Sequence, residues 1–422
     1  MEKSSTFFFL LISLAAIAAK EQPSTISIKY LDAYQFFTVP ITIGGQTFDV
    51  QFDTTTSETW VPSISTNYTV QPKYDASASA TSNQTNKTFE INDEEGDVRG
   101  KAVYDTIKIG QYTIEQFGFV QVEHYPKDFT DYPKGKLGIG LNREHGEQFD
   151  LLRTLKNNKL INREMITIDP FEKTLFIGDL PSIYNDTYTK CNATPTEDLD
   201  DDYRSGWACE VSHLFFGGKK ETDTIDDATE VSVRVMFDSA YPYISMRKTF
   251  LPTFKQNFIT PIFNDTCTQV KENNEVFFLC DYNEELFAKA KLTFVMEGYG
   301  YVLDSTTLFA KKAENKYELL IRFCDENDDI WGFGAPFTSK HVMVYDQEDA
   351  QVGFLLGEKE DMTEEWTMWT KGETVQQKKE RMFMLILGAS IIGGVLLLIV
   401  ICLICRSCKK QKNELERGPL MK

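Results

Sequence analysis

The feature that most constrains this sequence is an approximate internal repeat of a strand followed by an acidic turn. The first copy, VQFDTTTSETW, is centred on Asp53, and the second, VMFDSAYPYIS, is centred on Asp238. In each copy an apolar run ends in Phe-Asp and a hydroxyl residue follows, Thr54 in the first and Ser239 in the second. Self-similarity within one chain predicts two related structural units. We therefore expect two distant carboxylates to reach equivalent positions.

Each copy is followed further along the chain by an apolar element that contains glycine. GKLGIGL, with Gly138, follows the first copy, and IWGFGAPF, with Gly334, follows the second. Two carboxylates that meet across a pseudo-twofold axis cannot both ionise easily, so they share a proton. One can then act as a base toward a water molecule while the other protonates or hydrogen-bonds a substrate carbonyl. This chemistry needs no nucleophilic serine or cysteine and no catalytic histidine, and we expect neither a cofactor nor a metal.

Between residues 27 and 357 the sequence pattern is mainly β. The run from Tyr34 to Thr55 reads as two strands joined by a Gly44-Gly45 hairpin turn, and similar short β-branched and aromatic runs recur after it. The clearest helical pattern runs from Glu147 to Ile161. A hydrophobic share of 42% is typical of a globular protein, and a net charge of -19 argues against binding to nucleic acid.

The two ends of the chain indicate a protein that is held in a membrane. Residues 1–19 combine a short polar segment, an apolar run and small residues, which is the pattern of a signal peptide. Residues 358–381 read as a charged stalk and residues 382–405 as an uncharged transmembrane helix. Basic residues in the tail, residues 406–422, favour a cytosolic C-terminus. We expect a single-pass type I membrane protein with its ectodomain lumenal or extracellular, in the endolysosomal system or at the cell surface.

The cysteines and asparagines of the expected ectodomain fit an oxidising compartment. Five of the eight cysteines precede the membrane segment, and this odd number leaves one unpaired or bridged to another chain. That part of the sequence has no Cys-x-x-Cys pair and no His pair at metal-ligand spacing, so it gives a metal site no support. Glycosylation is plausible at several of its Asn-x-Ser/Thr sequons, which are Asn67, Asn83, Asn86, Asn185, Asn192 and Asn264.

Several segments resemble the pepsin family of aspartic proteases. The segment from Tyr30 to Ser63 resembles the N-terminal strands and first active-site loop of that family, including the Trp-Val-Pro after the loop. GDVRGKAVYDTIKIG resembles the flap strand, and WGFGAPFTSKHVMVYDQEDAQVGF resembles the closing strands of the second lobe. The resemblance spans about residues 28–357. It implies a mainly β, bilobal fold with pseudo-twofold symmetry, in which residues 28–183 form the N-terminal lobe and residues 184–357 the C-terminal lobe.

The resemblance also implies roles for individual residues. Asp53 and Asp238 would be the catalytic pair, and the hydroxyls of Thr54 and Ser239 would lock the two loops together across the axis. The remaining implied positions are Thr56, which supports the first loop, and Trp60, which packs beneath the flap. Asp93, or Asn92 if the loop is shifted by one residue, stands where the family has its flap tyrosine.

Disulfide pairing is implied by the same resemblance. Cys280 and Cys324 fall where the family has its second-lobe disulfide. Cys191 and Cys209 are expected to pair across neighbouring strands. These two pairs leave Cys267 as the odd cysteine.

The sequence departs from the family pattern of Asp-Thr/Ser-Gly in both loops. Thr55 and Ala240 replace the two glycines, whose backbone N–H groups face the carboxylates, and a Cβ at these positions is expected to shift those donors. Tyr241 follows Ala240 where a small hydroxyl residue is usual, so a hydrogen bond to Asp238 is expected to be missing. These departures lower the expected catalytic competence without removing the fold.

Two functions therefore remain open at the level of the sequence. The first is a membrane-tethered aspartic endopeptidase that cleaves polypeptides with Asp53 and Asp238. The second is a pseudoprotease whose cleft binds peptides or a protein partner without cutting them. In both, we expect a monomer with a polypeptide as its partner.

Overall fold

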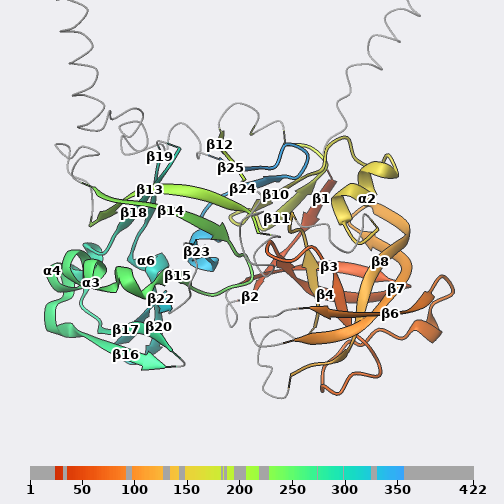
Figure 1. Ribbon diagram of the computed structural model, residues 1–422, viewed down its shortest axis with the longest axis horizontal. Helices are drawn as coiled ribbons and strands as arrows, with labels where there is room; N and C mark the ends of the chain where they lie inside the picture. The colour runs from red at the N-terminus through yellow and green to blue at the C-terminus, as the bar shows by residue number, and fades with distance from the viewer. Residues whose placement is uncertain are drawn as a thin grey trace, which may run out of the picture.

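The chain folds into two halves, each built around its own β-sheet, with a third sheet between them (Figure 1). The computed structural model describes residues 24–31, 36–91, 97–126, 134–141, 148–181, 184, 188–193, 206–217, 228–272, 274–297, 299–324 and 330–355. Within these residues strands predominate and helices are short, so the expected mainly β fold class is confirmed.

The first half of the chain forms an eight-stranded sheet. Its strands, in spatial order, are β2 (Lys29–Leu31), β3 (Phe36–Ile43), β4 (Gln46–Asp53), β9 (Lys136–Gly138), β5 (Trp60–Pro62), β8 (Tyr112–His124), β7 (Val98–Ile109) and β6 (Asn83–Ile91). The predicted hairpin is confirmed, because β3 pairs antiparallel with β4. Gly44 and Gly45 form its turn with φ values of +55° and +82°, which glycine adopts without steric cost.

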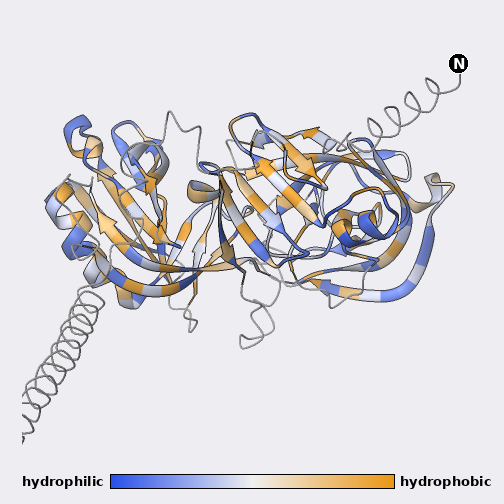
Figure 2. Ribbon diagram, turned by 90° about the horizontal axis from the view of Figure 1, so that it is seen from above, coloured by the Kyte–Doolittle hydropathy of each residue, from blue (hydrophilic) through white to orange (hydrophobic). Residues whose placement is uncertain are grey.

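The second half forms an eleven-stranded sheet. Its strands, in spatial order, are β19 (Tyr299–Leu303), β18 (Leu292–Met296), β13 (Ala208–Phe216), β14 (Thr229–Phe237), β23 (Ile330–Phe333), β15 (Ile244–Arg247), β22 (Ile321–Cys324), β17 (Glu275–Asp281), β21 (Lys316–Leu319) and β20 (Phe309–Ala313), with β16 (Cys267–Glu272) paired to β17. Hydrophobic and hydrophilic residues alternate along many strands, which is typical of sheets with one buried face (Figure 2).

A six-stranded sheet joins the two halves. Its strands, in spatial order, are β1 (Ser24–Ser27), β11 (Thr174–Ile177), β10 (Met165–Asp169), β24 (Met343–Asp346), β25 (Gln351–Leu355) and β12 (Tyr188–Asn192). The junction is the antiparallel pair β10–β24, with Met165 opposite Asp346. β1 precedes residue 28, where the N-terminal lobe was expected to begin, and pairs with β11.

The internal repeat of the sequence corresponds to one topological unit that occurs twice. In the first half, β4 runs parallel to β9, and β9 pairs antiparallel with β5. In the second half, β14 runs parallel to β23, and β23 pairs antiparallel with β15. Each acidic residue of the repeat therefore ends or follows the first strand of an equivalent three-strand unit.

The helices are short and flank the sheets. The helix expected from Glu147 to Ile161 is α2 (Leu151–Asn157), which begins late because the Asp150 side chain caps it by accepting a 2.9 Å hydrogen bond from Arg153 N. The other helices are α3 (Leu251–Phe254), α4 (Thr260–Phe263), α5 (Glu284–Ala288), α6 (Ser305–Leu308) and α7 (Ala335–Thr338), with a π-helical stretch, η6 (Lys255–Ile259), between α3 and α4.

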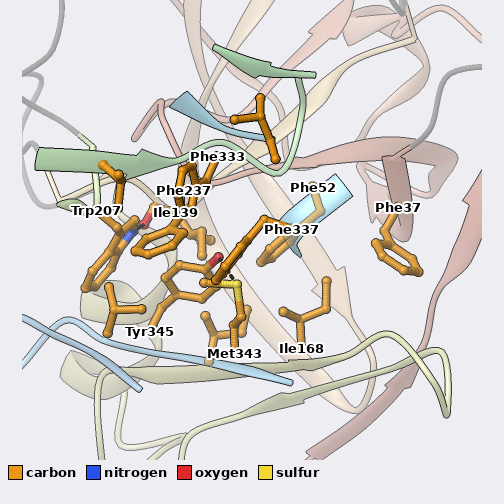
Figure 3. Close-up of a cluster of buried hydrophobic side chains, with 14 of the residues drawn as sticks. Phe37, Phe52, Ile139, Ile168, Trp207, Phe237, Phe333, Phe337, Met343 and Tyr345 are labelled. Atoms are coloured by element: carbon orange, nitrogen blue, oxygen red, sulfur yellow. Dashed lines mark hydrogen bonds between the residues drawn. The ribbon is translucent and has the colours of Figure 1, made fainter. Parts of the chain in front are cut away.

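A cluster of buried side chains from both halves lies where the three sheets meet, and we call it the shared aromatic cluster (Figure 3). Its members include Trp207, Phe237, Phe337 and Tyr345. Trp207 is fully buried, and its Nε1 donates a 2.9 Å hydrogen bond to the carbonyl of Ile139 in the other half. The Trp207 ring lies 5.3 Å from that of Tyr345 on β24, and Phe237 lies 5.6 Å from Phe337 on α7. Each fully buried side chain of this size contributes roughly 1.5–3 kcal/mol. The residues that flank the two acidic turns, Phe52 and Phe237, therefore belong to one continuous hydrophobic core.

The disulfides correct one expectation from the sequence. The structure joins Cys191 to Cys209, the pairing that was expected across neighbouring strands. It joins Cys280 to Cys267 and not to Cys324, because β16 and β17 form a hairpin in which Cys267 lies directly opposite Cys280 with their Cα atoms 4.0 Å apart. Cys324 on β22 keeps its thiol, with Sγ 3.8 Å from Glu275 Oε1.

Several expectations from the sequence concern residues outside the described part of the chain. These are the signal peptide, the stalk, the transmembrane segment, the tail, Asp93 and the sequon at Asn185. Within the residues that the structure describes, no helix has the length and apolar character needed to cross a membrane. The side chains of the other sequons, Asn67, Asn83, Asn86, Asn192 and Asn264, are exposed.

Candidate active site

Asp53 is the last residue of β4 and lies in the centre of the first half. In the β4–β9 pair Gln51 is opposite Lys136 and Asp53 is opposite Gly138. The Asp53 side chain is only 1% exposed. The backbone on either side is fixed, because Ile139 N donates a 2.9 Å hydrogen bond to the carbonyl of Asp53.

Asp238 occupies the equivalent place in the second half. It directly follows β14, and its N–H donates a 3.1 Å hydrogen bond to the carbonyl of Phe333 on β23. The residue is 6% exposed. Both acidic residues of the repeat are therefore buried at the end of a strand that is paired in parallel with a glycine-containing strand.

Three buried hydrogen bonds connect the two acidic turns. Thr54 Oγ1 donates to the carbonyl of Phe237 at 2.6 Å and accepts from Ser239 N at 3.0 Å. In return, Ser239 Oγ donates to the carbonyl of Phe52 at 2.7 Å. The hydroxyl of each turn thus bonds the backbone that precedes the acid of the other turn, and the two turns lie against each other.

The glycines of the repeat allow the backbone to approach closely. A Cβ on Gly138 would lie 2.6 Å from the carbonyl oxygens of Thr56 and Glu58, and one on Gly334 would lie 2.2 Å from those of Tyr241 and Tyr243. Such contacts exclude any side chain at either position. Gly138 and Gly334 therefore allow the backbone at equivalent positions to lie directly against the two acidic turns. Their matching places in the sequence repeat indicate the same arrangement.

The turn backbones hold one oxygen of each carboxylate. Asp238 Oδ1 accepts hydrogen bonds from Ala240 N at 2.9 Å and Tyr241 N at 3.1 Å. Asp53 Oδ1 accepts from Thr55 N at 2.8 Å and, more weakly, from Thr56 N at 3.3 Å. The expectation that a Cβ in place of glycine would displace these donors is wrong, because both turns keep the backbone hydrogen bond.

Thr55 adds a donor that glycine could not supply. Its Oγ1 donates a 2.7 Å hydrogen bond to Asp53 Oδ1, the same oxygen that its backbone N–H contacts. With the N–H of Thr56, this oxygen accepts from three donors in all. The two acidic turns are therefore chemically unequal, with an additional hydroxyl on the Asp53 side.

The other oxygen of Asp53 faces a lysine. Lys136 Nζ lies 3.2 Å from Asp53 Oδ2, and the Lys136 side chain is only 10% exposed. Side chains alternate between the two faces of a strand, so Gln51 and Asp53 project on one face of β4. Because Lys136 is opposite Gln51 in register, its side chain can extend along that face to the carboxylate.

Thr56 and Glu58 form a second polar group on the first acidic turn. Thr56 Oγ1 donates to Glu58 Oε2 at 2.7 Å, and Ser57 Oγ donates to Glu58 Oε1 at 2.8 Å. Thr56, expected to support the Asp53 turn, contributes its backbone N–H to Asp53 while its hydroxyl is directed to Glu58.

Tyr345 lies on the core side of the two turns. Burial raises the pKa of Tyr345 far above its ordinary value, the negative charge of Asp238 raises it further, and a hydrogen bond with Thr54 lowers it. The phenol is therefore neutral at neutral and acidic pH, where it adds no charge to the site.

Trp60 packs against the hairpin formed by β6 and β7. It is fully buried and belongs to a cluster with Phe89 and Ile91 of β6 and Val98 of β7. Its ring meets that of Tyr125 at 5.9 Å in an edge-on arrangement. Residues 92–96, which include Asp93, come between β6 and β7 in the sequence and lie outside the described residues.

Sequence reasoning missed Lys136, Gln51 and Glu58. Gln51 is fully buried, and its Nε2 donates a 3.2 Å hydrogen bond to the carbonyl of Ala240 in the second turn. A signal was present, because Lys136 interrupts the otherwise apolar run GKLGIGL and Gln51 lies between Val50 and Phe52. A polar side chain in a buried strand needs a partner, and here each partner belongs to an acidic turn.

Metal binding has no support in the described part of the chain. No group of three or more His, Cys, Asp or Glu side chains there is placed to hold a metal ion. The site instead consists of two buried carboxylates on equivalent turns that are hydrogen-bonded to each other.

Comparison with known proteins agrees with this geometry. The family model described as "Eukaryotic aspartyl protease" matches residues 35–356, and the chain belongs to that family. Bovine pepsin A is 35% identical over 132 residues, which are 30% of this chain and 34% of that protein. Bovine pregnancy-associated glycoprotein 1 is 35% identical over 130 residues, or 29% of this chain and 34% of that protein. These alignments span about a third of each relative's length.

A longer alignment exists at lower identity. Rabbit gastricsin is 22% identical over 352 residues, which cover 77% of this chain and 82% of that protein. The mainly β architecture of two halves is thus consistent with the fold of pepsin-like aspartyl proteases.

Proposed function

We propose that this chain is an aspartic endopeptidase in which Asp53 and Asp238 activate water to hydrolyse peptide bonds. The observation that carries the proposal is the reciprocal bonding of Thr54 and Ser239, which fixes the two acidic turns against each other. Both carboxylates are buried and each has one oxygen held by its own turn. Two such groups are suited to act as one unit.

The two carboxyl groups have different roles in the reaction. One carboxylate takes a proton from water, and the water oxygen adds to the carbonyl carbon of the peptide bond. The other carboxyl donates its proton to the carbonyl oxygen, so the intermediate is neutral. The first carboxyl then gives the proton it took from water to the nitrogen, and the second carboxylate takes a proton from a hydroxyl of the intermediate as the C–N bond breaks. An acid and an amine leave, and the pair returns to its starting protonation state. Hydrogen bonds from the turn backbones keep the carboxylates oriented throughout.

We also propose that the active unit is a monomer tethered by residues 382–405, with residues 24–355 lumenal or extracellular. The exposed sequons at Asn83, Asn86 and Asn264 support this orientation, as does the pairing of cysteines in both halves of the fold.

The test uses the full chain, purified in detergent, with a peptide library digested between about pH 3 and pH 7 and cleavage products read by mass spectrometry. Hydrolysis is expected in the wild type and is expected to fall by at least about a hundredfold in Asp53→Asn and in Asp238→Asn. Asp49→Asn, a change on the exposed part of β4, is the matched control and should keep wild-type rates. Cleavage that survives both active-turn substitutions would contradict the proposal.

A second function, peptide binding without hydrolysis, is favoured by one specific observation. The Thr55 hydroxyl donates to Asp53 Oδ1 in addition to the backbone N–H groups, so three donors fill that oxygen and leave it no capacity to accept a hydrogen bond from water. A chain that binds library peptides but cleaves none at any pH, in the wild type and in Thr55→Gly, would establish this alternative.

A further inference from the structure

The charge on Asp53 is balanced inside the site by a buried lysine. Lys136 Nζ lies 3.2 Å from Asp53 Oδ2, and the two side chains are 10% and 1% exposed. A pair of opposite charges this far from solvent is only weakly screened. A buried ion pair of this kind also requires both groups to be charged, because neutralising one partner leaves the other charge buried and uncompensated.

The contacts at the two oxygens of Asp53 reinforce each other. Oδ1 accepts three donors from Thr55 and Thr56, and Oδ2 faces the ammonium of Lys136. Asp238 Oδ1 accepts two backbone donors. Both oxygens of Asp53 are therefore engaged by groups from its own half of the fold.

We infer that Lys136 is a positioning residue that restrains catalysis, because its ammonium holds Oδ2 of Asp53 while three donors fill Oδ1, which leaves Asp53 little capacity to share a proton with Asp238. This inference rests on the proposed endopeptidase function. Removal of the charge on Lys136 is expected to restore the coupling between the two carboxylates. Hydrolysis should then become faster and should extend to higher pH.

The direction of the pH effect follows from the charges. With Lys136 present, Asp53 and Lys136 together are neutral, so ionisation of Asp238 meets little repulsion. Without the lysine charge, the second carboxyl of the pair must ionise beside a first negative charge, which is unfavourable. The singly protonated pair therefore persists to higher pH, and the alkaline limb of the kcat/KM profile moves upward.

Other titratable groups face this pair from neighbouring elements, and all of them remain in the variants. Asp238 follows β14, and Tyr345 on β24 is buried and neutral. The described titratable groups on the adjoining loops are Glu58, which is bonded to Thr56 and Ser57, Lys134, which precedes β9, and Tyr241, which follows the second acidic turn.

The experiment measures kcat/KM against pH for the full chain with a single library-derived peptide. Lys136→Gln removes the charge and keeps a polar side chain, Lys136→Met removes both, and Lys136→Arg keeps the charge. We expect the Gln and Met variants to be about tenfold faster or more, with the alkaline limb shifted to higher pH. The Arg variant should follow the wild-type profile. Lys108→Met, a change at an exposed position on β7, should alter neither rate nor profile.

Failure of the role of Lys136 and failure of the endopeptidase function give different results. If the wild type cleaves with dependence on Asp53 and the folded Gln and Met variants show neither gain nor shift, the role of Lys136 is wrong and the endopeptidase function stands. If neither the wild type nor any folded Lys136 variant cleaves, the endopeptidase function is wrong, and the inference falls with it. A gain that is lost again in Lys136→Gln/Asp53→Asn supports both.

Discussion

The two acidic residues are equivalent in the fold but different in their surroundings. Asp238 is held by the backbone of its turn, whereas Asp53 also contacts the hydroxyl of Thr55 and the ammonium of Lys136. The replacement of glycine by threonine in the Asp53 turn therefore acts through an added donor, since the backbone N–H keeps its place. Chemistry at this site is controlled by a few contacts to a single carboxylate.

The Thr55 contact leads to a prediction at the scale of one residue. Thr55→Gly removes the hydroxyl donor to Asp53 Oδ1 and keeps the backbone donor. A hydrogen bond to a charged group is worth about 1.5–3 kcal/mol, so kcat/KM should rise about tenfold as Asp53 Oδ1 regains the capacity to accept a hydrogen bond from water. Steady-state kinetics on the library-derived peptide measures the change.

Thr55→Ser is the matched control, because it keeps the hydroxyl and should stay near the wild-type rate. Equal rates for the Gly and Ser variants would show that the hydroxyl has no influence on catalysis.

His341 supplies a second residue-level prediction, on stability. Its ring is buried between Phe337, at 4.4 Å, and Tyr301, at 5.5 Å, and burial lowers the pKa of His341 from 6.5 to about 4. As the pH falls below about 6.5, the unfolded chain takes up the proton before the folded chain does. Stability is therefore fully present above about pH 6.5 and falls by about 3 kcal/mol as the pH approaches 4.

Urea denaturation between pH 7 and pH 4 measures this loss. His341→Phe should reduce the pH dependence of the unfolding free energy by most of that amount, while His124→Phe, at an exposed position, should leave it unchanged. An identical pH dependence in wild type and His341→Phe would mean that this histidine is not kept neutral by the fold.

At the scale of elements, local signals predicted the parts of the fold that depend on neighbours in the sequence. Gly44 and Gly45 predicted the β3–β4 hairpin, because glycine permits the positive φ of that turn. The helix near residue 150 was predicted, but its start was placed too early, because the capping role of Asp150 was not considered. The repeat predicted that Asp53 and Asp238 end equivalent strands.

Pairings between segments that are far apart in the sequence were harder to predict from the sequence. The junction of β10 with β24 connects Met165 to Asp346, and no local pattern specifies such a pair. The predicted disulfide of the second half was wrong because the prediction followed the family resemblance. It did not consider the β16–β17 hairpin, whose register places Cys267 opposite Cys280. Lys136 was missed because its place in an apolar strand indicates a buried partner but does not say which one.

The hairpin disulfide is open to direct measurement. Digestion without reduction, after alkylation of thiols, should release one linked peptide pair joined by Cys267 and Cys280 and another joined by Cys191 and Cys209. Cys324 should carry the alkyl group once the chain is denatured. A linked pair containing Cys280 and Cys324 would restore the pairing implied by the family resemblance and contradict the register seen here.

At the scale of the whole molecule, the fold brings two buried acids together from strands that are far apart in the sequence. The shared aromatic cluster and the six-stranded sheet fix the halves to each other, and the hydroxyls of Thr54 and Ser239 set the turns in contact. If the pair works as one unit, removal of either acid abolishes the reaction, and removal of the second adds little.

A double-mutant cycle on kcat/KM, with Asp53→Asn, Asp238→Asn and the combined variant, tests this claim most directly. Each single variant should lose about as much activity as the double variant, because neither carboxyl works without the other. Losses that multiply, or a single variant that retains most of the wild-type rate, would contradict it.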